Sequence, residues 1–274
     1  MRKLAAIGAL LFVAPVVLAQ ALPSDAAGAE PAGKSVAAPV TYEEAVDITR
    51  KTPGYKNLQR IGLAIHGYHD IFGRYPAAVS FGPDGKIPHS WRVELLPMLK
   101  HYVDGIDRDA LSGEVNRDEY NELIKACGYD VNEPWNSRRN SGALNAMPDL
   151  FRHPHDERGS IHSAYYAITG PGTLFDGSTI VHCDDIKGWV GSVLMIAESD
   201  SREPWTKPID VVYIPEGTAP RLGGFTPRGF LALTADGAVH FIHDSARPAD
   251  LRAVMTKDTG DSFSIPGIPF RWRD

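Results

Sequence analysis

Four acidic residues surround one tryptophan in the second half of the chain, and this residue set could bind or process sugars. The acids are Glu198, Asp200, Glu203 and Asp210, and the aromatic residue is Trp205. Paired carboxylates can act as acid and base in glycoside hydrolysis, and an aromatic ring offers an apolar floor to a ligand. The pattern fits a buried core tryptophan with acids around it equally well. Glu198, Trp205 and Asp210 are therefore candidate ligand residues, and the sequence identifies no catalytic residue.

Histidines gather at three places with other residue types that ligate metals. The three groups are His66, His69 and Asp70; His153, His155, Asp156 and His162; and His182, Cys183, Asp184 and Asp185. A closed zinc site needs four convergent ligands that are oriented by further partners. Residues 153 and 155 can point the same way in an extended segment, but no pattern brings a third and fourth ligand to them. We therefore expect no metal site and no cofactor.

The charge balance and the missing motifs exclude several function classes. The formal net charge is -6, with 28 basic and 34 acidic residues that are scattered along the chain. Nucleic-acid binding needs clustered Lys and Arg, so we expect no nucleic-acid partner. The sequence contains neither Gly-x-Ser-x-Gly nor His-Glu-x-x-His, so nothing indicates a serine hydrolase or a zinc protease of the common kinds.

The first 21 residues have the pattern of a signal peptide. Arg2 and Lys3 precede an apolar, uncharged run over residues 4–18, and Ala19 and Ala21 provide small residues for cleavage. The run is shorter than the roughly 20 residues that span a bilayer. We expect an exported chain, periplasmic or extracellular, with no stable membrane span after cleavage and an unknown protein or cell-envelope partner.

The remaining sequence divides into a linker and a domain. Residues 22–40 are rich in Ala, Pro and Gly and poor in large apolar residues, which predicts a disordered tether. Residues 41–274 are long enough for a single domain. In an exporting compartment Cys127 and Cys183 could form a disulfide, the only pairing possible, or remain two buried thiols.

Three helices are predicted before residue 130. The first folded element is expected over Tyr55–Phe72, where apolar residues recur every three or four positions and Gly73 ends the helix. A short helix follows over 91–96, with Ser90 as its N-cap and Pro97 as its end. The third covers 117–127. Asn116 caps this third helix, Glu119 completes a capping box and Gly128 closes it.

Strands are predicted in the second half. Short β-prone runs occur at 163–169, 193–197 and 211–214, and the runs 229–235 and 238–242 flank Asp236-Gly237. The Asp-Gly pair predicts a hairpin with a type I′ turn. A final helix is expected after Ser245, with Pro248 in its first turn. Helices first and strands later indicate an α+β fold with an antiparallel sheet.

Six motifs follow one another along the chain: KNLQRIGLAIHGYHDIFGRYPAA (56–78), SWRVELLPML (90–99), NEPWNS (132–137), the F-x-x-P-x-D stretch at 151–156, IAESDSREPWTKPIDV (196–211) and GGFTPRGFLALTADGAVHFI (223–242). In this order they resemble the family called domain of unknown function 1559, which is abundant in planctomycete-type bacteria and is also labelled bacterial solute-binding. The resemblance covers roughly residues 55–260 and implies a pseudopilin-like α+β fold outside the cytoplasm, with no assigned activity.

The chain departs from that family pattern at three positions. A signal peptide and a tether replace the usual pilin-like leader. His153 stands where members carry a cysteine, and Thr226 stands where they carry a histidine ten residues before the Asp-Gly pair. A family disulfide or a histidine function at these positions is therefore not expected here.

Two kinds of function are compatible with these features. The first is a non-catalytic extracytoplasmic structural or interaction protein that resembles a pseudopilin head. The alternative is a small-ligand or glycan-binding module that uses the region of Trp205. A metal-dependent hydrolase is a third reading, which would need one of the histidine clusters.

The export hypothesis predicts a defined N-terminus. In an exporting bacterial host the mature chain should begin at Gln20 or Leu22, because the small residues at 19 and 21 follow the apolar run. Mass spectrometry of the purified chain measures this directly. An intact Met1 on a membrane-bound product would contradict the prediction.

Overall fold

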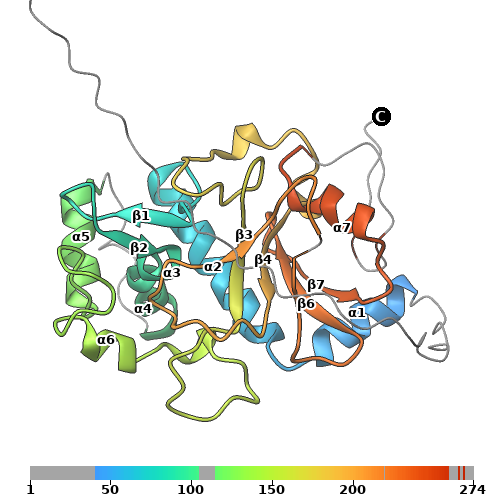
Figure 1. Ribbon diagram of the computed structural model, residues 1–274, viewed down its shortest axis with the longest axis horizontal. Helices are drawn as coiled ribbons and strands as arrows, with labels where there is room; N and C mark the ends of the chain where they lie inside the picture. Colours follow the sequence, from blue (N-terminus) through green and yellow to red (C-terminus); the bar gives the residue numbers. More distant parts are fainter. Residues whose placement is uncertain (1–40, 105–114, 219, 259–264, 266–267, 269–274) are drawn as a thin grey trace, which may run out of the picture. The chain divides into compact units, whose positions relative to one another are not determined.

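The computed structural model describes residues 41–104, 115–218 and 220–258, together with residues 265 and 268. The signal peptide and the tether expected at 1–21 and 22–40 lie outside the described residues. The described part combines helices with two open sheets (Figure 1), so the expected α+β class is confirmed. No helix among the described residues is long and apolar enough to cross a membrane.

The elements follow one another along the chain with long loops between them. The helices are α1 (Tyr42–Lys51), α2 (Tyr55–Phe72), α3 (Trp91–Glu94), α4 (Leu96–Asp104), α5 (Arg117–Ala126), α6 (Ser141–Asn145) and α7 (Pro248–Met255). The strands are β1 (Val79–Phe81), β2 (Pro88–Ser90), β3 (Tyr165–Thr169), β4 (Leu194–Glu198), β5 (Val211–Val212), β6 (Gly229–Thr234) and β7 (Val239–His243). Short 3-10 turns are η2 (Asp149–Phe151), η3 (Cys183–Asp185) and η4 (Val190–Ser192).

A five-stranded sheet forms the centre of the fold, with the strand order β5-β3-β4-β6-β7. Three of its four pairings are antiparallel, as expected, but β5 pairs with β3 in parallel. The expectation of a wholly antiparallel sheet is therefore wrong at this edge. The reason is that β4 ends opposite the start of β3, and the long loop after β4 passes β3 and enters β5 from that same end of the sheet.

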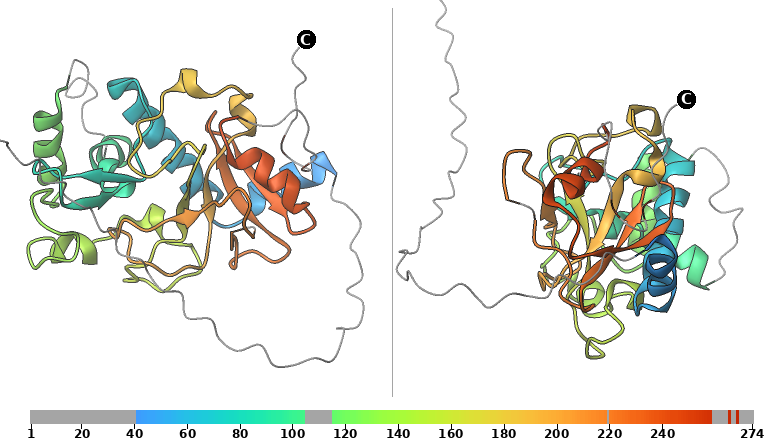
Figure 2. Two further views of the ribbon diagram at one scale, coloured as in Figure 1. Left: turned by 45° about the horizontal axis from the view of Figure 1, so that its top comes forward. Right: turned by 90° about the vertical axis from the view of Figure 1, so that its right-hand side faces the viewer.

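Helices cover both faces of this sheet (Figure 2). The apolar stripe of α2 packs on one face with Leu231 and Leu233 of β6, so closely that a Cβ on Gly62 would lie 3.0 Å from Leu233. On the other face Val254 and Met255 of α7 are buried in a second cluster against the strands. The helix expected at Tyr55–Phe72 is confirmed at both ends, and Gly73 closes it with φ +65°.

The first folded element is α1, not α2 as predicted. Thr41 and Glu44 form a capping box at its start, a signal that the sequence shows as T-x-x-E. The hydroxyl of Thr49 accepts a hydrogen bond from the backbone N–H of Phe241 at 2.8 Å, which fastens α1 to β7. The tether is therefore expected to end at this helix.

Two other local predictions are corrected near residue 90. Ser90 caps α3 as predicted, but Pro97 does not end helical structure, because α4 begins at Leu96 and holds Pro97 in its first turn. Proline is tolerated there since first-turn N–H groups have no helical acceptor. The β1–β2 hairpin before α3 was not predicted; its strands are only three residues long.

The remaining elements lie where the sequence predicts them, with bounds that differ by one or two residues. The capping box of Asn116 and Glu119 starts α5, whereas Cys127 is the C-cap and lies outside the helix. The helix expected after Ser245 is α7, with Arg247 as its N-cap and Pro248 in its first turn, as predicted.

The β6–β7 hairpin forms, but its turn is not type I′. Gly237 has φ +82° whereas Asp236 has a negative φ. The N–H of Gly237 donates to Thr234 O, and the N–H of Thr234 donates to Ala238 O, both at 2.9 Å. This is a type I turn followed by a left-handed glycine, the three-residue hairpin loop.

Candidate functional site

Asp210, one of the three candidate ligand residues, lies in the interior at the entrance to β5. Its Oδ1 accepts hydrogen bonds from Trp91 Nε1 at 3.0 Å, from Arg92 Nη2 at 2.9 Å and from the N–H of Ala167 at 2.8 Å. The side chains of Arg92 and Asp210 are 1% and 2% exposed, so the ion pair is excluded from water. Asp210 therefore joins α3 to β3 instead of facing a ligand.

Arg92 is held on every side. Its Nη2 donates to Tyr165 O at 2.7 Å and its Nη1 donates to Ser90 Oγ at 3.0 Å. The guanidinium carbon lies 4.7 Å from the centre of the Trp91 ring and 4.9 Å from that of Tyr166. A buried guanidinium is tolerated only when paired and hydrogen-bonded in this way. We use the name Arg92–Asp210 clasp for this set of residues, which consists of Ser90, Trp91, Arg92, Tyr165, Tyr166 and Asp210.

Trp205, the second candidate, is a core residue. It is 1% exposed, its ring stacks on Phe151 with centroids 5.8 Å apart, and its Nε1 donates to Leu144 O at 3.0 Å. A ring with both its apolar faces and its N–H in the interior offers no floor to a sugar. Of the two readings of this pattern, the structure has the buried core tryptophan.

Glu198, the third candidate, ends β4 and is fully buried. Its Oε2 accepts a hydrogen bond from the N–H of Leu231 at 2.9 Å, which continues the β4–β6 pairing through a side chain. Its Oε1 has no hydrogen-bond partner and lies 3.8 Å from His153 Nε2. A Cβ on Gly54 would lie 2.8 Å from this oxygen, so the start of α2 packs directly on it. Burial raises the pKa of Glu198 to about 7.

His153 faces Glu198 from the loop after η2. Its Nδ1 accepts a hydrogen bond from the N–H of His155 at 3.2 Å, and its ring stacks on Phe225 with centroids 4.2 Å apart. Burial first, and then the nearby His155, lower the pKa of His153 to about 4. Glu198 and His153 are thus a buried acid and base whose facing atoms make no hydrogen bond. The sequence pointed to each residue separately but not to their pairing.

The three candidates therefore do not form one site, since each is held by different partners. Asp210 bonds to Arg92, Glu198 faces His153, and Trp205 stacks on Phe151. The other two acids of the segment form ion pairs nearer the surface, Asp200 with Arg221 and Glu203 with Lys207.

The histidine groups are likewise separated. His66 Nε2 lies 3.0 Å from Ala235 O, the His69 ring lies tilted at 5.2 Å from that of Tyr75, and His182 Nδ1 lies 2.9 Å from Gly73 O. In the part of the chain that the structure describes, no three His, Cys, Asp or Glu side chains are placed to hold a metal ion.

The disulfide considered for Cys127 and Cys183 is not formed. Cys127 is the C-cap of α5, and Cys183 is exposed at the start of η3 beside Tyr75. Both cysteines are thiols, as in the second alternative, but Cys127 is only partly buried and Cys183 is exposed.

A polar groove of about 550 Å³ lies beside the buried pair. It is lined by His155, Asp156, Glu157, Arg158, Gly159, Ser160, His162 and Arg202. Arg202 has φ +57°, a conformation that costs energy in a residue other than glycine. Its guanidinium donates to Asp156 Oδ1 at 3.1 Å and lies 5.9 Å from the Phe225 ring. This groove holds more ionisable side chains than the others described here.

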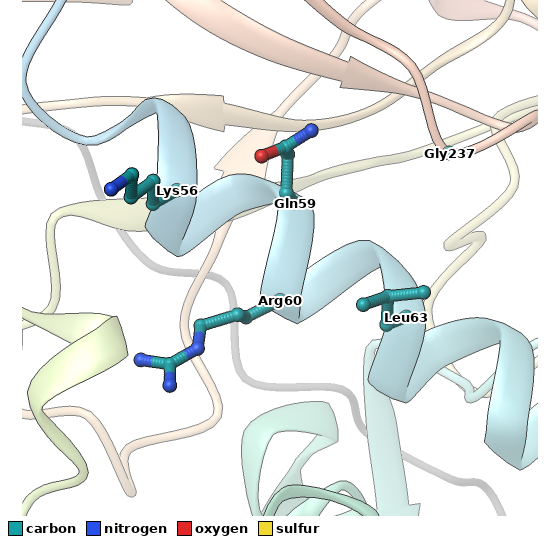
Figure 3. Close-up of a pocket in the computed structure, with 5 residues that line it drawn as sticks. All are labelled: Lys56, Gln59, Arg60, Leu63 and Gly237. Atoms are coloured by element: carbon teal, nitrogen blue, oxygen red, sulfur yellow. The ribbon is translucent and has the colours of Figure 1, made fainter. Parts of the chain in front are cut away.

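A second groove, of about 560 Å³, follows the outer side of α2 (Figure 3). Lys56, Gln59, Arg60 and Leu63 project from successive turns, and Gly237 of the β6–β7 turn lies beside them. A third, of about 380 Å³, shares Arg60 and runs between α2 and α4, where it is lined by leucines. Neither groove contains a carboxylate pair or a histidine, so neither has the residues of an acid–base centre.

Comparison with known proteins gives one match. Residues 48–182 match the model of a family described as a protein of unknown function (DUF1559). The resemblance expected from the sequence motifs is therefore confirmed over this range, which ends before β4. No curated protein and no solved structure matches the chain.

The raised pKa of Glu198 predicts a pH-dependent stability. The folded state favours the protonated acid, so its contribution is present below the ordinary pKa of 4.5 and is lost as pH rises through about 7. Glu198→Gln stays neutral and should gain stability relative to the parent chain between pH 5 and pH 8, by on the order of 2–3 kcal/mol. Urea unfolding at several pH values measures the difference.

The lowered pKa of His153 makes its contribution to stability change with pH in the opposite sense. His153 is present in both proteins, so comparing the two at each pH removes most of its contribution. Glu157→Gln, at an exposed position, is the matched control and should show no such trend. A difference between Glu198→Gln and the parent that stays flat from pH 5 to pH 8 would contradict a raised pKa of Glu198.

Proposed function

Since residues 48–182 belong to the DUF1559 family, we propose that this chain is an exported, non-catalytic structural or interaction protein. Its action would be outside the cytoplasm, on a protein or cell-envelope partner. The observation that carries the proposal is the use of Asp210, Trp205 and Glu198, which form structural contacts in the interior.

Export is supported by the sequence alone. The positive Arg2 and Lys3, the apolar run over 4–18 and the small residues at 19 and 21 form a complete signal-peptide pattern. The following residues, 22–40, have the composition of a linker, which would hold the domain away from its point of attachment or release.

A non-catalytic role is supported by how the acids are used. Glu94 accepts two hydrogen bonds from Arg117, at 2.6 and 2.7 Å, and Asp210 likewise accepts from Arg92. Each of these carboxylates satisfies donors of the protein itself, and a catalytic acid must instead reach a substrate. The packing of the long α2 along a largely antiparallel sheet supports a head of the pseudopilin-like kind.

A second candidate function rests on the polar groove at His155. Backbone strain in a residue other than glycine is concentrated at ligand and active sites, and Arg202 lines this groove with φ +57°. Its guanidinium could bind a carboxylate or phosphate group if Asp156 were displaced. The groove would then bind a small anionic ligand, and the protein would be a binding module.

One experiment separates the two functions. The purified mature chain is mixed with cell-envelope oligosaccharides and with small organic anions, and the unfolding temperature and any hydrolysis products are measured. A structural or interaction protein should show no product and no rise in unfolding temperature, since only bound ligand stabilises the folded state.

A rise of several degrees with one ligand would contradict the first proposal. The binding-module function would then require that Arg202→Gln abolishes the rise and that Arg138→Gln, an exposed arginine outside the groove, retains it. Appearance of a hydrolysis product that Glu198→Gln abolishes would overturn the non-catalytic role.

A further inference from the structure

Large aliphatic side chains are exposed at the β5 edge of the central sheet. Ile209, Val212 and Ile214 are 40%, 58% and 57% exposed, although they lie within six residues of one another. We call residues 209–214 the β5 edge. Clusters of exposed apolar residues on a soluble domain mark interaction sites more often than isolated ones do.

The backbone of this edge is also available for pairing. Among the described residues β5 pairs with β3 alone, and it stands at the end of the strand order. Val212 is opposite Thr169, and the N–H of Tyr213 donates to Thr169 O at 2.7 Å. Backbone groups alternate in direction along a strand, so the N–H and C=O of Val212 point away from β3.

The side chains alternate in the same way. Val211 and Tyr213 are buried, and Tyr213 packs in the cluster of α7, whereas Val212 and Ile214 project from the opposite face. Asp210, the one charged residue of the β5 edge, is buried in the Arg92–Asp210 clasp. The exposed part of the edge is therefore uncharged and apolar.

We propose that the β5 edge pairs with the β5 edge of a second copy of this chain, antiparallel and around a twofold axis at Val212. This partner is part of the interaction role proposed above and rests on it. An uncharged apolar edge needs no complementary charge, and two identical edges can meet without like-charge repulsion. Each Val212 would exchange backbone hydrogen bonds with its counterpart, as in strand addition.

The chemistry of the flanking residues favours a closed pair over a growing filament. Pro208 and Pro215 bound the β5 edge and cannot donate to a ladder, so they limit pairing to the residues between them. Pairing uses the same edge of both copies, so a twofold contact closes on itself. A short ladder of this kind predicts a reversible dimer that depends on concentration.

The test measures molar mass by light scattering over a wide range of protein concentration. The parent chain should approach the mass of a dimer as concentration rises. Val212→Lys and Val212→Glu should each remain monomeric, because like charges would face each other across the axis. An equimolar mixture of the two variants should again form dimers, since lysine would then face glutamate.

Leu63→Lys is the matched control, because Leu63 is 54% exposed on α2 and should leave the dimer unchanged. Unfolding temperatures equal to the parent's show that the variants are folded. A parent that is monomeric at every concentration, variants that still dimerise, or a mixture that stays monomeric would overturn the proposal. A monomeric parent that is exported and binds no ligand would leave the proposed function intact, so the two failures are distinguishable.

Discussion

Arg92 and Asp210 meet in the interior with 2.9 Å between Nη2 and Oδ1, where α3, β3 and the chain entering β5 come together. The pair is excluded from water, so its stability depends on completing its hydrogen bonds with Ser90, Tyr165 and Trp91. Those contacts fix the start of α3 and hold β5 beside β3. The parallel pairing of β5 with β3, and the exposure of the other side of β5, therefore depend on this buried ion pair.

Glu198 shows a different way of burying an acid. Among the described residues Glu198 accepts one hydrogen bond, from Leu231, and the basic side chain within ion-pair distance is that of His153, at 3.8 Å, whose pKa is itself lowered by burial. Burial therefore raises its pKa to about 7 instead of stabilising its charge. The same strand-rich core thus contains one acid, Asp210, that is paired with an arginine and another, Glu198, that faces only a histidine, and both serve packing.

Local patterns were enough to predict much of the fold. The α2 stripe, the capping box of α5 and the Asp-Gly hairpin are specified by near neighbours in sequence. The parallel β5 pairing, the small β1–β2 hairpin and the placement of the two cysteines depend on contacts between distant residues, which periodicity does not record. Glu198, Trp205 and Asp210 were recognised as unusual for their residue types. Their separation into three structural sets required the fold, because Arg92 and His153 lie far from them in sequence.

A double-mutant cycle on the Arg92–Asp210 clasp tests this account most directly. Urea unfolding is measured for the parent, Arg92→Met, Asp210→Asn and the double variant. Each single change leaves a buried partner unpaired and should cost about 3–5 kcal/mol, and the double variant should cost clearly less than the sum. Single costs below about 1 kcal/mol, or costs that simply add, would mean that the fold does not depend on this pair.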